Sequence, residues 1–133
     1  MSDANVELVR RIYEQWAEGD FRAAVELYDP LILLVQGEGF PEQGTYLGLD
    51  GVGDYMATFL EAWERVTIEA LEVFAAGDSV VAKVVQRAIG RESGIVPTEF
   101  EYFQVWSFRG GRVIRLDVIR DRDEALRAVG ISD

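Results

Sequence analysis

The second half of the chain, from Val66 onward, alternates apolar and polar residues with a period of two. Successive side chains of a strand point to opposite faces, so this spacing predicts strands. We expect four of them, at about residues 66–75, 79–90, 95–109 and 112–120. The segments AAGD, RESG and RGG between these runs are turn signals. The pattern therefore predicts a meander of antiparallel strands, and any fold for this chain must accommodate it.

The first half of the chain has helical periodicity instead. Apolar residues recur at helical spacing over residues 3–18, which predicts an amphipathic helix. A second short helix follows, and we expect Asp29-Pro30 to end it, because a residue before proline avoids the helical region. Asp50 is predicted to cap a third helix over roughly residues 51–65.

Other segments complete the order of elements. The apolar run LILLVQG, residues 31–37, predicts a strand covered on both faces, and residues 45–47 predict a short strand. Asp121 begins a capping box that opens a last helix, which Gly130 ends. Segregated helices and a mainly antiparallel sheet predict an α+β fold. We expect a curved sheet wrapped over the N-terminal helices, leaving a cone-shaped fold with an open end.

Composition restricts the chemistry that the protein can perform. The chain has no histidine, so acid–base work would require a carboxylate, a tyrosine or Lys83, the only lysine. We expect neither a metal site nor a cofactor, because no zinc or phosphate-binding motif is present. A net charge of −11 disfavours nucleic acid and anionic membranes as partners.

Length and residue usage bound the organisation of the protein. A chain of 133 residues predicts a single domain, residues 1–133. The sequence lacks an apolar run of about 20 residues, the length of a membrane span, and its start does not resemble a signal peptide. With no cysteine there is no disulfide framework, which favours a cytoplasmic location.

The hairpin at Gly110-Gly111 decides which residues of the last two strands share a face. A three-residue loop over residues 109–111 would place Gln104 opposite Leu116. A two-residue Gly-Gly turn would place Gln104 opposite Asp117. We prefer the first register, because it leaves Asp117 on the outer face of the sheet.

The aromatic, mostly apolar face with isolated polar groups is typical of a small-molecule cavity. The candidate lining residues are Tyr13, Trp16, Leu34, Gln36, Phe59, Trp63, Gln86, Tyr102, Gln104, Trp106, Leu116 and Val118. The alternative for the aromatic residues is ordinary core packing, and for Gln104 a buried amide satisfied by its neighbours. A cavity built from these residues would be apolar and uncharged.

Three segments resemble a known superfamily when taken in order. They are VELVRRIYEQWAEGDFRAAVELYDP, GTYLGLDGVGDYMATFLEAW and FQVWSFRGGRVIRLDVIRDRDEALRAVG, which together span nearly the whole chain. The chain resembles the nuclear transport factor 2-like superfamily and, within it, the SnoaL-like polyketide cyclase group. The resemblance implies the cone-shaped fold and a homodimer. It does not fix a function, since the superfamily holds both enzymes and binding modules.

The chain departs from these relatives where they keep catalytic groups. Ketosteroid isomerase-like members have an acid on the first strand, where this chain has Leu33–Gln36, and a proton-donating aspartate whose nearest match is Gln104. Their tyrosine on the first helix aligns with Ile12, next to Tyr13. SnoaL-like proteins often have a histidine near residue 104 and an acid near residue 118. This chain has Gln104 and Val118 at these positions. We find no match to the Asp-Arg-Asp set of limonene epoxide hydrolase-like members.

These observations leave three hypotheses. We prefer a binding domain for a small apolar or aromatic molecule, with no evident catalysis. The alternative is a SnoaL-like isomerase, cyclase or hydrolase acting on a hydrophobic polycyclic or terpenoid compound, which would need Tyr13, Gln104, Asp117 or Glu38 in the cavity. In the third, the cone is only core, and the outer sheet face, with Phe103, Val105 and Val85, forms a dimer interface.

Overall fold

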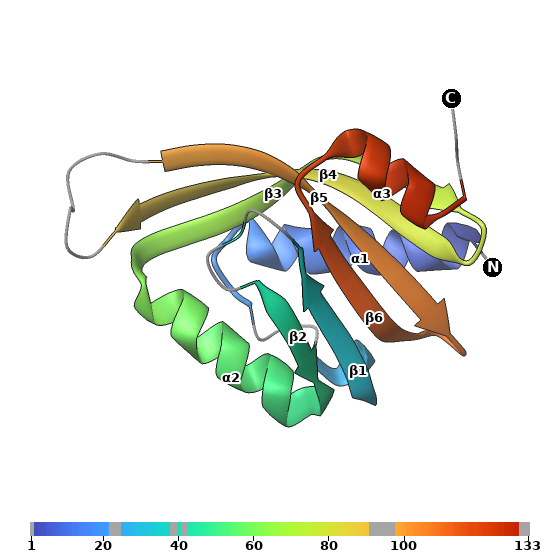
Figure 1. The fold of residues 1–133 in the computed structure, drawn as a ribbon, viewed down its shortest axis with the longest axis horizontal. Helices are drawn as coiled ribbons and strands as arrows, with labels where there is room; N and C mark the ends of the chain where they lie inside the picture. The colour runs from blue at the N-terminus through green and yellow to red at the C-terminus, as the bar shows by residue number, and fades with distance from the viewer. Residues whose placement is uncertain (1, 22–24, 38–39, 41–42, 91–97, 131–133) are drawn as a thin grey trace.

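The computed structural model describes residues 2–21, 25–37, 40, 43–90 and 98–130 (Figure 1). Along the chain these residues form α1 (Ser2–Trp16), a 3-10 turn (Val25–Leu27), β1 (Tyr28–Gln36), β2 (Gly44–Leu47), α2 (Gly48–Glu61), β3 (Trp63–Ala76), β4 (Ser79–Gly90), β5 (Thr98–Arg109), β6 (Arg112–Ile119) and α3 (Arg122–Ala128). The predicted strands of the second half and the short strand β2 are confirmed. The predicted RESG turn lies outside the described residues.

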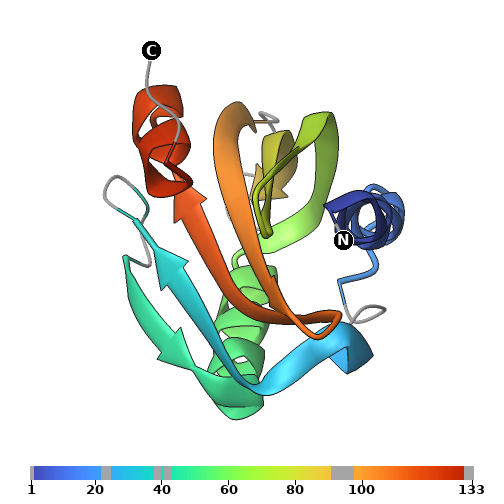
Figure 2. The same cartoon turned by 90° about the vertical axis from the view of Figure 1, so that its right-hand side faces the viewer.

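The strands form one curved, mixed sheet in the order β2-β1-β6-β5-β4-β3. Only the β1–β6 pair is parallel, and the other described pairs are antiparallel, which confirms the mainly antiparallel α+β prediction. Helix α1 packs on β3 and β4, α2 packs on β1, and α3 packs on β5 and β6. Figure 2 shows α1 and α3 on opposite sides of the sheet.

Alternation along the strands divides the apolar residues between two clusters. The larger cluster lies between the sheet and helices α1 and α2, and it includes the fully buried Val80, Val84 and Trp106. A smaller cluster lies under α3 and includes Phe103 and Val105. Phe103 and Val105 are buried within the chain itself, as is Val85. The expectation that these three side chains offer an outer dimer surface is therefore wrong.

Strand β1 begins earlier than the sequence predicts. Tyr28 already belongs to the strand, so Asp29-Pro30 lies inside β1 and does not end a helix. The described part of the predicted second helix is only the 3-10 turn. Proline is tolerated because the pairing of β1 with β6 is irregular between Tyr28 and Leu33, where no ladder N–H is required. Leu31 is 75% exposed, so the expectation of two covered faces is also wrong.

Helix α2 differs from its prediction at both ends. It begins at Gly48, and the residue at its N-cap position is Leu47, with no side-chain cap. Asp50 lies in the first turn, where a carboxylate favours the helix dipole without capping it. The helix ends at Glu61, and Trp63 is the first residue of β3. At the C-terminus, Asp121 caps α3 as predicted by accepting a hydrogen bond from the Glu124 amide at 3.0 Å.

The hairpin between β5 and β6 has the two-residue Gly-Gly turn of the alternative prediction, not the preferred three-residue loop, and neither predicted partner of Gln104 is observed. Arg109 pairs with Arg112 across a two-residue turn, because Gly110 and Gly111 both adopt positive φ, 58° and 79°. A bulge at Ile114 then adds one residue to β6, since Phe108 pairs with Val113 and Ser107 pairs with Arg115.

The bulge restores the predicted face although the predicted pairs are wrong. Gln104 lies opposite Val118, not Leu116, and Trp106 lies opposite Leu116. Asp117 pairs with Val105, whose side chain belongs to the cluster under α3. Asp117 therefore lies on the outer side of the sheet, as expected.

Candidate functional site

A cavity of about 780 Å³ lies between α2, the end of α1 and the inner face of the sheet. Most of its lining is apolar or aromatic. Ten of the twelve predicted residues line it, namely Trp16, Leu34, Gln36, Phe59, Trp63, Gln86, Tyr102, Gln104, Leu116 and Val118. The cavity is thus not filled by its own aromatic residues, as it would be if the cone were only core.

Period-two alternation places the sheet residues in this lining. Leu34 and Gln36 are buried on one face of β1, while Leu33 and Val35 between them are only partly buried. Gln104 on β5 faces the same way. A strand exposes every second side chain to the same side, so the few polar groups reach the cavity at fixed positions.

Sequence reasoning does not identify part of the lining. The additional residues are Phe21, Val25, Tyr28, Ile32, Phe40, Leu49, Val52, Gly53, Tyr55, Met56, Ala57, Leu60, Ala62, Ile68 and Phe100. The helical spacing of Val52, Tyr55 and Met56 on α2 is a usable signal for them, because these residues share the apolar face with Phe59. Phe40 carries no comparable signal, since it lies outside any helix or strand.

Tyr13 and Trp106 are not part of the lining but support it from behind. The Trp106 indole N–H donates a hydrogen bond to the Tyr13 hydroxyl at 2.8 Å, and this hydroxyl donates to Gln104 Oε1 at 2.6 Å. An indole is only a donor, so the single Tyr13 hydrogen must go to Gln104. The chain of bonds therefore orients the Gln104 amide.

Two further polar groups in the lining have unused hydrogen-bonding capacity. The Gln36 amide contacts the Tyr55 hydroxyl through one of its polar atoms, and its other polar atom has no partner among the described residues. The Trp16 indole N–H also lacks a partner there. Both side chains are at least nine-tenths buried, and an unpaired buried polar group is costly.

The described lining contains no Asp, Glu, Lys or Arg. Burial raises the pKa of the Tyr28 and Tyr102 hydroxyls above their ordinary value of about 10, because it disfavours the charged form. These hydroxyls are protonated at neutral pH, and that of Tyr102 donates to Gln86 Oε1 at 2.9 Å. The described site thus offers neutral donors and acceptors but no base.

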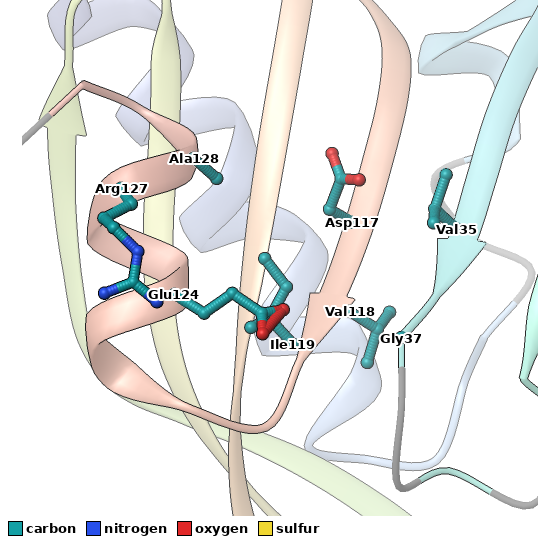
Figure 3. Close-up of a pocket in the computed structure, with 8 residues that line it drawn as sticks. All are labelled: Val35, Gly37, Asp117, Val118, Ile119, Glu124, Arg127 and Ala128. Atoms are coloured by element: carbon teal, nitrogen blue, oxygen red, sulfur yellow. The ribbon is translucent and has the colours of Figure 1, made fainter.

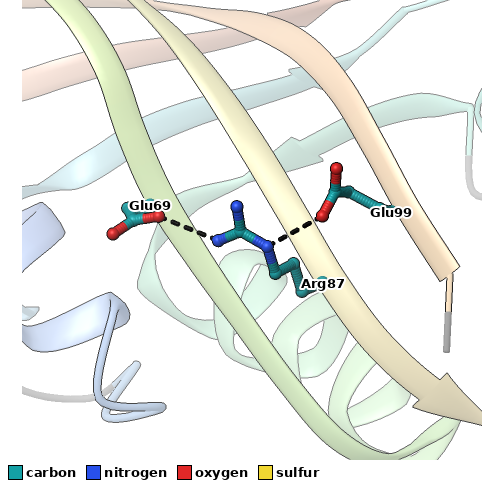
Figure 4. Close-up of polar contacts among 3 residues, drawn as sticks. All are labelled: Glu69, Arg87 and Glu99. Carbon is teal, nitrogen blue, oxygen red and sulfur yellow. Dashed lines mark hydrogen bonds and ion pairs between the residues drawn. The ribbon is translucent and has the colours of Figure 1, made fainter.

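Carboxylates gather on the other side of the sheet. A cleft of about 400 Å³ there is lined by Asp117 and by Glu124 of α3 (Figure 3). Asp117 pairs with Arg115 at 2.9 Å. Farther along the sheet, Arg87 bonds Glu69 at 2.8 Å and Glu99 at 2.9 Å, and both carboxylates raise the pKa of its guanidinium (Figure 4). Asp117 therefore does not serve the cavity, and Glu38 lies outside the described residues.

The described residues offer neither a metal centre nor a membrane-spanning helix. They contain no group of three or more His, Cys, Asp or Glu residues that could hold a metal ion. Among the same residues, no helix has both the length and the apolar character needed to cross a membrane. The cavity, at about 780 Å³, is larger than the cleft beside α3, at about 400 Å³.

A curved, mainly antiparallel sheet folded around helices and a cavity defines the NTF2-like α+β class. The structure superposes on an NTF2-like protein from Burkholderia pseudomallei with a TM-score of 0.77 and 19% identity, covering 96% of this chain and 98% of the other. An NTF2-like protein from Burkholderia thailandensis gives 0.77 and 22%, with the same coverages. TerC crystallised with polyporic acid gives 0.74 and 19%, covering 96% and 99%.

Sequence comparison then gives the family. The family profile of the SnoaL-like domain matches residues 9–116, so the chain belongs to the SnoaL-like domain family. No curated protein matches the chain. The structural relatives are less than 25% identical, and they establish the fold alone.

Proposed function

We propose that the protein binds an uncharged, largely apolar or aromatic small molecule in the cavity between α2 and the sheet. The observation that carries the proposal is a cavity of about 780 Å³ whose described lining is apolar and aromatic, with a few neutral polar groups. This combination is characteristic of ligand sites, where apolar area supplies affinity and isolated polar groups orient the ligand.

The apolar area is sufficient for useful affinity. At ~25 cal/mol per Å², a ring system that buries roughly 300 Å² of apolar surface would gain about 7 kcal/mol before the cost of association. A charged ligand would lose its hydration without gaining a counter-ion from the described lining. The site is therefore better suited to a neutral molecule.

The alternative function is catalysis on a hydrophobic polycyclic or terpenoid compound. Family membership supports catalysis, but the polar groups in and around the cavity are better suited to binding than to catalysis. The Tyr13 hydroxyl is engaged with Gln104 behind the lining, and Asp117 lies on the outer side of the sheet. Isomerisation or cyclisation requires a group that accepts a proton. Binding requires only the neutral groups that line the cavity.

We further propose that residues 1–133 form one domain that acts as a homodimer in the cytoplasm. The family resemblance supports the dimer, and the lack of cysteine supports the compartment.

Two probes with one ring skeleton test the binding proposal. We expect N-phenyl-1-naphthylamine, which is neutral, to bind saturably with increased fluorescence at one site per chain. Its sulfonated analogue, 8-anilinonaphthalene-1-sulfonate, should bind at least about tenfold more weakly, because an anion would lose its hydration inside the cavity. Fluorescence titration measures both. Equal or tighter binding of the sulfonate, or no saturable binding of the neutral probe, would contradict the proposal.

A further inference from the structure

Two neighbouring indoles of the core differ in what their N–H groups bond. The rings of Trp16 and Trp106 lie 5.6 Å apart, centroid to centroid. Trp106 is fully buried and donates its N–H to the Tyr13 hydroxyl at 2.8 Å. Trp16 is 5% exposed and lines the cavity, and its Nε1 has no partner among the described residues. The two residues are thus an internal comparison between a satisfied and an unsatisfied donor.

Packing holds the Trp16 ring in place. Tyr13 contacts it edge-on at 5.6 Å between centroids, and Phe21 packs against it at 5.5 Å. With Trp106 these contacts surround the ring with aromatic neighbours, so rotation toward a new partner would disrupt the core. An indole nitrogen donates but does not accept. Trp16 belongs to the cavity lining, so a ligand is a source from which this buried donor could obtain an acceptor.

We propose that the molecule bound in the cavity carries an uncharged hydrogen-bond acceptor, such as a ketone oxygen, that receives the Trp16 indole hydrogen. This inference rests on the proposed binding function and makes Trp16 a specificity-determining residue. The acceptor is uncharged because no cationic side chain belongs to the described lining. The inference adds a polar requirement to a site whose affinity otherwise comes from apolar area.

Two probes of nearly equal shape test the requirement. 2-Acetylnaphthalene has a ketone oxygen where 2-isopropenylnaphthalene has a methylene group. We expect the ratio of ketone to alkene affinity to be roughly tenfold higher in the wild type than in Trp16→Phe, which keeps an aromatic ring but loses the donor. Comparing ratios removes the difference in hydrophobicity between the probes. The matched variant Trp63→Phe should change both affinities together and preserve the wild-type ratio.

Nuclear magnetic resonance of the ¹⁵N-labelled wild type gives an independent measurement. The chain has three tryptophans and so three indole N–H signals. The ketone should move the Trp16 signal downfield relative to the alkene, while the Trp106 signal, whose N–H is already bonded, should differ little between the probes. This measurement decides the question even if Trp16→Phe does not fold.

The outcomes separate the inference from the function beneath it. If both probes bind but the ratio is unchanged in Trp16→Phe, or the Trp16 signal is the same with ketone and alkene, the inference is wrong and the binding function stands. If neither probe binds the wild type, both the binding function and the inference are contradicted.

Discussion

Leu34→Trp is expected to lower the affinity for N-phenyl-1-naphthylamine by at least about 100-fold, because the indole would occupy the space that the probe rings need. Leu34 is 4% exposed, lies near the end of β1 and lines the cavity. Aromatic residues are well accommodated in strands, and the existing void accepts the larger side chain. The free energy of unfolding should therefore change by less than about 2 kcal/mol. Fluorescence titration and urea denaturation measure the two effects.

Leu33→Trp is the matched control for this variant. Leu33 is the preceding residue of the same strand and faces the other side of the sheet, where it is only partly buried. We expect this variant to bind the probe with an affinity within about threefold of the wild type. Equal loss of binding in both variants would show that the probe binds outside the cavity or that either change disrupts the strand.

Trp106→Ala is expected to lower the free energy of unfolding by about 3–5 kcal/mol, a large part of the ~5–15 kcal/mol of a typical domain. The side chain is fully buried, so its removal leaves a void behind the cavity wall. The Tyr13 hydroxyl also loses the donor that fixes the direction of its bond to Gln104. Urea denaturation measures the loss.

Trp63→Ala provides the comparison for this prediction. Trp63 is only partly buried, at the start of β3, and it lines the cavity. The same truncation should therefore cost less stability there, while removing a direct contact with the ligand. A Trp106→Ala protein no less stable than Trp63→Ala would contradict the supporting role that we assign to Trp106.

The sequence predicts most of the fold because its patterns are local. Period-two alternation from Val66 onward yields the meander, and helical spacing yields α1 and α2. What it does not predict depends on backbone geometry. The length of the Gly110-Gly111 turn follows from two positive φ angles, and the bulge at Ile114 follows from how β6 meets its neighbours. The turn length and the bulge together set the register of β5 and β6. Apolar–polar alternation along each strand therefore does not determine that register.

The candidate site shows a similar division. Residues that alternate along a strand, such as Leu34 and Gln104, are predictable from the face that they share. Tyr13 and Trp106 are aromatic residues that the sequence places on the same faces as the lining residues, but they do not line the cavity. They bond to each other behind Gln104. Sequence spacing does not distinguish a wall from the layer that supports it. That distinction requires the positions of α1 and the sheet relative to each other.

A crystal structure of the protein with N-phenyl-1-naphthylamine would test the central claim most directly. We predict the probe rings inside the cavity between α2 and the sheet, in contact with Leu34 and Phe59 and within hydrogen-bond reach of at least one neutral polar group of the lining. A probe bound only in the cleft beside α3, or a cavity that stays empty at saturating probe, would contradict it.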